Sequence, residues 1–350
     1  MAAPRFLFIV RYRSDSGGNC PFNNGSLWTG GLYYSALFVV QMLNSFGIFA
    51  QIEQVVDNNS IDAVVAKWQP TTVIIEGLWV VPEKFAVLQK LWPAVTWIVR
   101  CHSEIPFLAY EGIAIDWLLR YVKYENLAIA SNSTYGTRDF EAVIHAAESS
   151  WGKDQIARKV FHLPNWYPQV DPLPLKKPNN VLDVGCLGAI RPLKNQLIQA
   201  VAAVEWAQKS KKLLNFHVNG RVEQCGDSVL KNIAALLKGT GNVLVEHPWV
   251  PRDQFLARLA GLDLGMQVSF SETFDITAAD TVALGVPLVT SNEVVWSSPS
   301  CQAVPTNAAS IVARLKAVTG GRKSIITAEN QHRLRAFCKE SEETWLDFAS

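Results

Sequence analysis

The sequence has little net charge. Its 350 residues include 32 Lys and Arg against 31 Asp and Glu, which leaves a formal net charge of +1 at pH 7. Because attraction to phosphates supplies most of the non-specific affinity for nucleic acid, this balance argues against a nucleic-acid-binding protein that works by overall positive charge. It leaves room for a local basic groove.

Paired cysteines and long apolar runs are absent too. The six cysteines lie far apart and form no Cys-x-x-Cys pair, which argues against a zinc site and favours free, mostly buried thiols in a reducing compartment. No stretch reaches membrane-spanning length, and the apolar run at residues 6–10 is too short for a signal peptide. We therefore expect a cytoplasmic protein without stable membrane insertion.

What the sequence does contain is an alternation of apolar strand-like runs and helix-like stretches. The continuous apolar run at 6–10 is typical of a parallel strand buried on both faces. Similar runs predict strands at 72–75, 95–99, 127–130, 214–220 and 262–268 and in the runs that begin at 181, 242 and 288, with helices near 32–43, 230–237, 252–260 and 328–348. This pattern predicts an α/β protein with parallel sheets.

The chain is long enough for two domains of ordinary size. A proline-rich segment at 166–180 precedes a new apolar strand, and prolines stiffen a connection while denying it helix or central-strand pairing. We therefore predict a first domain at 1–165, a linker at 166–180, a second domain at 181–325 and a C-terminal helix at 326–350.

Two loops carry glycine where a strand turns into a helix. Gly30 and Gly31 precede the first predicted helix, where glycine lets the backbone approach a ligand, although Gly-Gly is also common in plain turns. The loop after the strand at 181 carries Gly188, Arg191 and Lys194 before a helix. Two cations at a helix N-terminus suit a diphosphate, and a solvated basic loop is the alternative.

The stretch at 271–291 organises the second half. Glu272 follows an apolar strand, Asp280 comes eight positions later in a short helix, and Gly285 ends that helix before the next strand. Ligands bind open α/β sheets at such loops, because the N–H groups of a helix N-terminus are unpaired there. Carboxylates on such a loop accept hydrogen bonds from sugar or ribose hydroxyl groups, whereas an acidic loop that merely caps the helix is the alternative.

The whole stretch resembles the signature of retaining GT-B glycosyltransferases of family 4. That signature is Glu-x7-Glu followed by a short Ala-rich helix and Gly-Val-Pro, and here it reads Glu272-x7-Asp280 with Phe274, Ala283, Gly285, Val286 and Pro287 in their expected places. Asp280 replaces the second Glu, and Asp275 stands where the family usually has Gly. The second departure bears on the backbone, since Gly adopts positive φ more readily than Asp. The chain also resembles bacteriophage-encoded glycosyltransferases in general character.

The resemblance implies a GT-B fold, with two Rossmann-like domains facing a central cleft, and a UDP- or GDP-sugar donor held by the second domain without a metal. It implies that Glu272 binds donor-sugar hydroxyls, Asp280 the ribose, and Lys194 with Arg191 the diphosphate, Ala189 replacing the usual Arg. His102 would contact the donor sugar, although a lone His after a strand is more often a hydrogen-bonding structural residue. Further donor-binding candidates are Gly188, Thr273, Phe274, Gly30, Gly31, Asn219, Gly220 and Trp249.

The acceptor is the part of the function that the sequence leaves open. A saccharide or another small hydroxyl compound is one reading, and a hydroxymethylated base in phage DNA is another. The DNA reading predicts a basic groove on the first domain, to which Arg11, Arg13, Arg100, Arg120 and Lys123 would contribute. A different class of function is a non-catalytic GT-B protein that binds a nucleotide sugar or a glycan, or a nucleotide-sugar epimerase.

Overall fold

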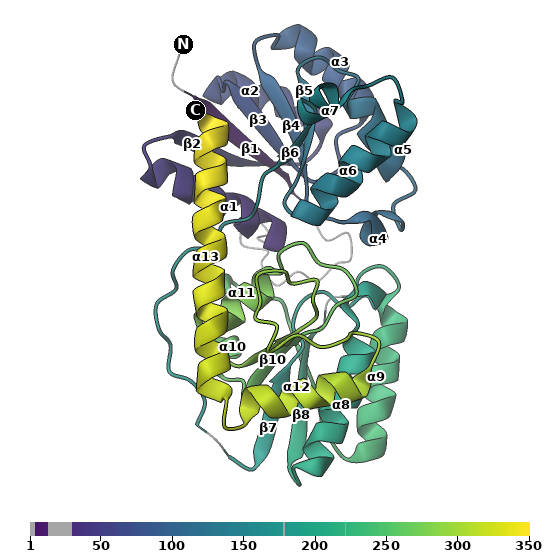
Figure 1. Cartoon of the computed structure of the whole chain (residues 1–350), viewed down its shortest axis with the longest axis vertical. Helices are drawn as coiled ribbons and strands as arrows, with labels where there is room; N and C mark the ends of the chain where they lie inside the picture. The colour runs from purple at the N-terminus through teal and green to yellow at the C-terminus, as the bar shows by residue number, and fades with distance from the viewer. Residues whose placement is uncertain (1–3, 13–29, 178, 221) are drawn as a thin grey trace. The chain divides into compact units, whose positions relative to one another are not determined.

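The computed structural model describes residues 4–12, 30–177, 179–220 and 222–350 of the chain (Figure 1). The chain divides into two compact α/β units. Unit 1 comprises Met1–Pro168 and Cys338–Ser350, and unit 2 comprises Gln169–Phe337. The division falls inside the proline-rich segment at 166–180, whose described residues form no helix or strand.

Unit 1 is built on a parallel sheet with the strand order β2-β1-β3-β4-β5-β6. Its strands are β1 (Arg5–Arg11), β2 (Phe49–Val55), β3 (Thr72–Glu76), β4 (Thr96–Cys101), β5 (Leu127–Ser131) and β6 (Val160–His162). The strands predicted at 6–10, 72–75, 95–99 and 127–130 are confirmed. The prediction missed β2, which is only half buried and carries polar residues, and β6, which has three residues. Both lie at the edges of the sheet, where the apolar signal is weakest.

Helices cover both faces of this sheet. One face packs against α2 (Ile61–Trp68), α3 (Pro82–Leu91), α5 (Ala114–Tyr121), α6 (Thr134–Ala147) and α7 (Lys153–Ala157). The other packs against α1 (Gly31–Ser45) and the end of α13 (Lys323–Ala349). Trp345 of α13 is fully buried there, 5.7 Å from the Phe8 ring by centroids, and its Nε1–H donates to the Pro164 carbonyl at 2.8 Å. The short α4 (Ile105–Leu108) and 3-10 turn η1 (Asn58–Ser60) complete the unit.

Unit 2 has a second parallel sheet, ordered β11-β10-β7-β8-β9. Its strands are β7 (Val181–Gly185), β8 (Leu213–Asn219), β9 (Val243–His247), β10 (Leu264–Gln267) and β11 (Leu288–Thr290), and each was predicted. Its helices are α8 (Gln196–Lys209), α9 (Gly226–Thr240), α10 (Arg252–Ala260), α11 (Ile276–Ala283), α12 (Ala308–Thr319) and the start of α13, with the 3-10 turn η2 (Pro192–Lys194). The main hydrophobic core of the unit includes buried residues of α8, α9 and α12. The helix α12 was not predicted.

The strand order of unit 2 reverses between β7 and β10. From β7 the chain continues to β8 and β9 on one side, whereas β10 and β11 lie on the other. Loops that leave neighbouring strands on opposite sides of such a switch point splay apart and open a crevice at the carboxyl end of the sheet. The loop after β7 carries Gly188 and Arg191, and the loop after β10 carries Glu272. The topology therefore brings the two predicted donor-binding loops to one edge.

The five described cysteines are free thiols, and four of them are buried. Cys225 is the exposed one. None of the helices in the described ranges is both long and apolar enough to cross a membrane.

Candidate functional site

Lys194 and Glu272 meet at the switch point of unit 2. Lys194 ends η2 after β7, and its Nζ lies 2.5 Å from Oε1 of Glu272 and 3.1 Å from Oδ2 of Asp275. The three side chains are 12%, 8% and 1% exposed. The two loops are also tied by their backbones, since Phe270 N–H donates to the Leu193 carbonyl at 2.9 Å. Residues predicted separately to bind a diphosphate and a sugar thus share one buried cluster.

The charges of this cluster are mutually dependent. Burial alone would lower the pKa of Lys194, but the carboxylates of Asp275 and Glu272 outweigh it and raise that pKa, so the lysine is protonated at neutral pH. Burial raises the pKa of Glu272, and Lys194 opposes this while Asp275 adds to it. Arg191 is close enough to act on both groups. The cluster therefore holds a charged lysine between two acids in a desolvated setting.

Asp275 adopts the positive φ that its position requires. It has φ +58° and ψ +86°, a left-handed conformation that glycine reaches without strain. Its Oδ1 accepts the backbone N–H of Ala278 at 2.9 Å and so caps α11, while its Oδ2 faces Lys194. The cap and the ion pair offset the strain. The departure from glycine at this position is thus accommodated and adds a carboxylate to the site.

Asp280 is held by an arginine that the sequence analysis missed. Arg252, the first residue of α10, places Nη2 at 2.5 Å from Oδ1 and Nη1 at 3.2 Å from Oδ2 of Asp280. The side chains are 16% and 2% exposed. Such a two-point contact fixes both groups in orientation. Nothing in the sequence near Arg252 indicates this partner, which lies 28 residues away.

In the loop after β7, there is free space beside the backbone of Gly188. Gly188 has φ +120°, and a Cβ added to it would meet no atom within 4 Å. Its N–H donates to Oδ1 of the buried Asn219 at 2.7 Å, so Asn219 at the end of β8 orients this loop. Gly220 follows and donates its N–H to the His247 carbonyl at 2.9 Å. Arg191 Nη1 lies 3.9 Å from a Glu223 oxygen.

The remaining predicted donor-binding residues differ in how far they are buried. The ring of Phe274 is 1% exposed and packs against Trp296 and Phe337, with centroids 5.9 and 5.4 Å away, so this side chain faces the core. Thr273 is 9% exposed, and Trp249 is half-buried in the loop after β9. In unit 1, Gly30 caps α1 and Gly31 begins it.

His102 belongs to a buried polar network of unit 1. Its Nδ1 faces the amide Nδ2 of Asn132 at 3.3 Å and its Nε2 contacts Glu76, so the ring accepts from Asn132 and donates to Glu76. Arg100 is 0% exposed and bonds Glu76 through Nη1 at 3.0 Å. Burial lowers the pKa of His102, although Glu76 opposes this. The imidazole is therefore neutral and directed toward groups of its own unit.

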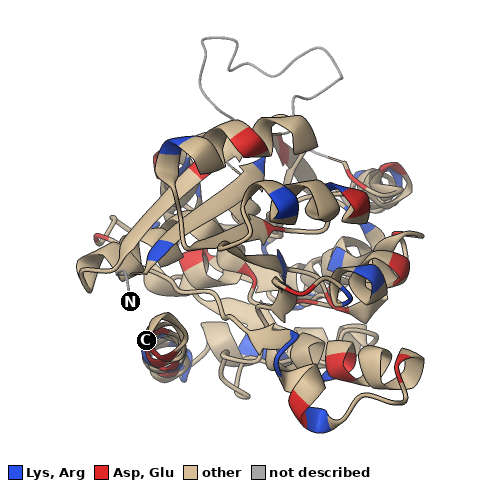
Figure 2. Ribbon diagram, turned by 90° about the horizontal axis from the view of Figure 1, so that it is seen from above, with Lys and Arg blue, Asp and Glu red and all other residues tan. Residues whose placement is uncertain are grey.

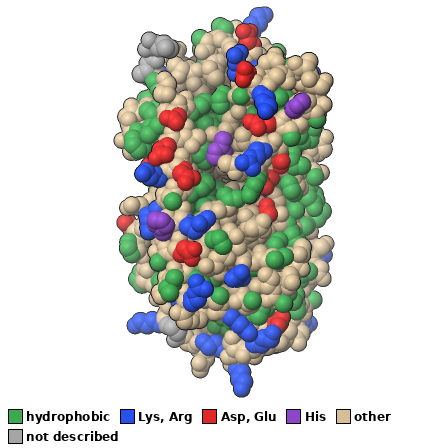
Figure 3. All heavy atoms as spheres, in the orientation of Figure 1, with side chains coloured by type: hydrophobic (Ala, Val, Ile, Leu, Met, Phe, Trp, Pro, Cys, Tyr) green, Lys and Arg blue, Asp and Glu red, His purple; other side chains and the backbone are tan. Residues whose placement is uncertain are grey.

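The basic groove expected for a DNA acceptor is not supported by the residues predicted to form it. The prediction was wrong for Arg100, whose guanidinium is fully buried. Arg120 pairs with Glu83 and Asp116, and Lys123 pairs with Glu148 at 3.0 Å. Arg13 lies outside the described residues. In Figures 2 and 3, Lys and Arg residues are interspersed with Asp and Glu residues.

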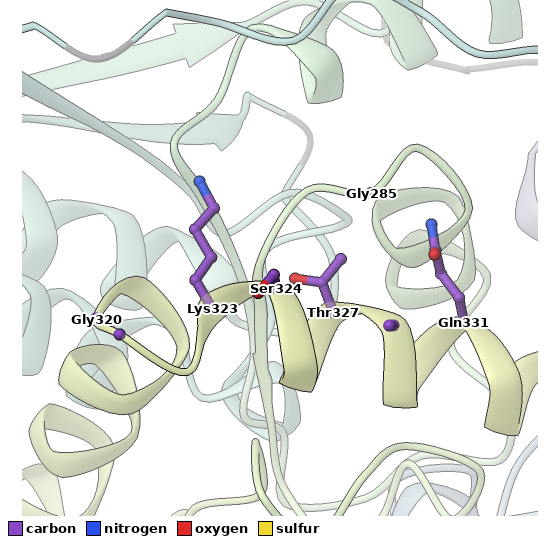
Figure 4. A pocket seen from close by; sticks show the side chains of 8 residues that line it. Gly285, Gly320, Lys323, Ser324, Thr327 and Gln331 are labelled. Atoms are coloured by element: carbon purple, nitrogen blue, oxygen red, sulfur yellow. The ribbon is translucent and has the colours of Figure 1, made fainter.

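One open pocket in unit 2 involves none of the predicted site residues. It has a volume of about 420 Å³ and is lined by Lys323, Ser324, Thr327, Ala328 and Gln331 of α13 and by Gly285, Gly320 and Gly321. Figure 4 shows these α13 side chains along one side of the helix, near the turn at Gly285. Within the described ranges, no group of three or more His, Cys, Asp or Glu is arranged to hold a metal ion.

Two parallel-sheet α/β units in one chain, the second with its switch point between β7 and β10, give the chain the GT-B fold. Among solved structures it is similar to a trehalose-6-phosphate synthase, OtsA, with TM-score 0.70 and 12% identity over 99% of this chain and 98% of that one.

It is also similar to a sucrose-phosphate synthase from Thermosynechococcus elongatus, with TM-score 0.69 and 11% identity over 98% of both chains. A UDP-forming α,α-trehalose-phosphate synthase from Burkholderia vietnamiensis has TM-score 0.68 and 11% identity over 99% of this chain and 97% of that one. Neither a family model nor a curated protein sequence matches the chain. At these identities the likeness establishes the fold.

Proposed function

We propose that the protein is a glycosyltransferase that moves a sugar from a nucleoside-diphosphate sugar to a hydroxyl acceptor with retention of configuration. The observation that carries this proposal is the ion pair of Lys194 with Glu272 at the switch point of unit 2. A cation for phosphate and a carboxylate for hydroxyl groups lie side by side there, at the N-terminus of α11. The similar solved structures named above include one synthase described as UDP-forming, which supports a UDP-sugar donor.

Each residue of the cluster has a chemical role in this proposal. The leaving diphosphate gains negative charge as the glycosidic bond breaks, and Lys194 with Arg191 would stabilise that charge without a metal. Glu272 would accept hydrogen bonds from donor-sugar hydroxyls. The Asp280 and Arg252 pair would meet the ribose, with the guanidinium supplying donors that the carboxylate lacks. The acceptor hydroxyl would attack on the face that the diphosphate leaves, which retains the configuration, and its proton would pass to an oxygen of the departing diphosphate.

A saccharide or another small hydroxyl compound is the acceptor that we favour. Of the residues named for a DNA groove, Arg100 is buried and Arg120 and Lys123 are paired with acids. The free thiols also fit a cytoplasmic enzyme. His102 stays a predicted contact for the donor sugar, and His102→Ala should then reduce turnover.

A thermal-shift screen against UDP, GDP, ADP and their sugar conjugates tests the donor site. A ligand at a hundred times its dissociation constant stabilises the fold by about 2.7 kcal/mol, and we expect this for one nucleotide. Lys194→Met should abolish the shift. Lys176→Met is the matched control, because Lys176 is 13% exposed and also lies between two acids, 2.6 Å from Asp183 and 2.5 Å from Asp263.

Equal loss of the shift in both variants, or no shift with any nucleotide, would contradict the donor site. Measuring turnover then distinguishes a glycosyltransferase from a binding protein and from an epimerase. Glu272→Gln should still bind nucleotide but release far less nucleoside diphosphate in the presence of acceptor. A wild-type protein that binds the nucleotide sugar and turns over no acceptor would be a binding protein, and one that converts the donor into its epimer without acceptor would be an epimerase.

A further inference from the structure

We propose that the Asp275 carboxylate weakens the binding of the free nucleoside diphosphate more than it weakens the binding of the nucleotide-sugar donor. The product would then be released more readily after transfer. The inference deepens the proposed function and rests on it, because it assumes that Lys194 receives the diphosphate. Its basis is the position of a fixed carboxylate 3.1 Å from the Lys194 ammonium, at a place where the resembling signature has a glycine.

Asp275 cannot easily turn away from this position. Its side chain is 1% exposed, and one carboxylate oxygen is bound to the N–H of Ala278. The backbone at φ +58° is held by the loop and the start of α11. A group fixed at both ends keeps its charge directed at Lys194 when a ligand arrives.

A phosphate bound to Lys194 would come close to this charge. Nζ lies 3.1 Å from Oδ2, and a phosphate oxygen accepting from the same ammonium would add about 2.8 Å, so the two anions would lie within about 6 Å of each other. Their repulsion is little screened, because the cluster is buried. Oε1 of Glu272 also lies 2.5 Å from the same ammonium.

Donor and product differ in charge at the phosphate concerned. In a nucleotide sugar the distal phosphate is bonded both to the sugar and to the other phosphate, and it carries one negative charge. After transfer it is a terminal phosphate, whose second ionisation falls near pH 6, so it carries close to two charges at neutral pH. The Asp275 carboxylate therefore opposes the product more strongly than the donor.

Asp275→Asn removes the charge with little other change. Asparagine caps helices as well as aspartate does and tolerates positive φ. We expect calorimetric titration to show that the free nucleoside diphosphate, tested as UDP, GDP or ADP according to which binds the wild type, binds the variant about tenfold more tightly. The corresponding nucleotide sugar should gain less. Product inhibition of turnover should strengthen in parallel.

The control is Asp263→Asn. Asp263 is likewise paired with a lysine of unit 2, Lys176, but it directly precedes β10 and so lies at the amino end of that strand, away from the predicted donor site. This variant should leave both affinities unchanged. Asp275→Gly, which also tolerates the backbone conformation, should tighten the diphosphate as Asp275→Asn does.

Tighter binding is the informative direction, since loss of a hydrogen bond or of local order can only weaken it. Unchanged or weaker diphosphate binding in both Asp275 variants would overturn the inference while leaving the donor site intact. A wild-type protein that binds no nucleotide, or whose binding survives Lys194→Met, would instead overturn the proposed function and the inference with it.

Discussion

Arg100 and Glu76 form a fully buried ion pair in unit 1. The Arg100 guanidinium donates to the carbonyls of Leu163 and Pro164, to Oδ1 of Asn165 and to Glu76, and both members of the ion pair are 0% exposed. Burial alone would raise the pKa of Glu76, but Arg100 and His102 outweigh it and lower that pKa. The pair therefore ties the ends of β3 and β4 to the segment after β6.

We predict that Arg100→Met costs about 3 to 5 kcal/mol of unfolding free energy, because it leaves Glu76 buried without its main partner. Urea denaturation would measure the loss. The control is Arg120→Met, whose guanidinium is 38% exposed and whose surface pairs are worth at most about 1 kcal/mol.

A loss below about 1 kcal/mol in Arg100→Met would show that water reaches Glu76. Because the pKa of Glu76 is lower in the folded protein than the value near 4.5 expected for the unfolded chain, the ionised carboxylate stabilises the fold above that pH. This contribution to the unfolding free energy is lost as the pH falls below that value.

At the scale of elements, the start of α9 supports the loop that carries Arg191. Ile190 bridges to Val222, and its carbonyl accepts the N–H of Glu223 at 2.9 Å. A Cβ on Gly226, the first residue of α9, would lie 2.0 Å from that carbonyl oxygen. Close backbone approach, and not a positive φ, is thus the reason for glycine at this position.

Gly226→Ala should therefore destabilise the protein and weaken nucleotide binding, because the loop of Arg191 must move to relieve the clash. Gly239→Ala in the same helix is the matched control. A Cβ there meets no atom within 4 Å, so we expect stabilisation by about 0.5 to 1 kcal/mol. Thermal melts with and without nucleotide measure both effects. Equal behaviour of the two variants would contradict the close approach.

Strands could be predicted from the sequence where a local run of apolar residues marks them. Apolar runs identified β1, β3, β4, β5 and all five strands of unit 2. The signal is clearest in β1, β5, β10 and β11, which are almost wholly buried, because strands buried on both faces contain few polar residues, whereas β9 is only half buried. Edge strands β2 and β6 lack that signal. The motif singled out Lys194 and Glu272, which the structure brings into contact, whereas Arg252 was missed because its contact with Asp280 depends on how α10 packs beside α11.

At the scale of the whole molecule, the last residues of the chain belong to the core of unit 1. Cys338–Ser350 group with Met1–Pro168, although α13 begins at Lys323. Trp345 is 0% exposed, packs against Phe8 and lies with its ring 5.5 Å from the Arg100 guanidinium carbon. The fold of unit 1 therefore depends on the C-terminal helix.

Trp345→Ala should cost about 3 to 5 kcal/mol, since it removes a fully buried tryptophan side chain from this face of the sheet. Hydrogen exchange should show the loss in the amides of β1 and β3. Ile325→Ala on the same helix, where the side chain is 60% exposed, should change little. Unaltered exchange in β1 after Trp345→Ala would mean that the helix end is dispensable.

The sequence by itself determined the class of fold and the spacing of the carboxylates in the central motif. Apolar runs bounded by polar loops specify buried parallel strands, and the spacing from Glu272 to Asp280 lies within one strand-loop-helix unit, so both are local properties of the chain. Only the tertiary structure decided that Asp275 faces Lys194 across 81 residues, that Arg252 holds Asp280 and that Arg100 is buried. Those outcomes depend on long-range packing and on the desolvation it imposes, and neither is encoded in the spacing of a motif.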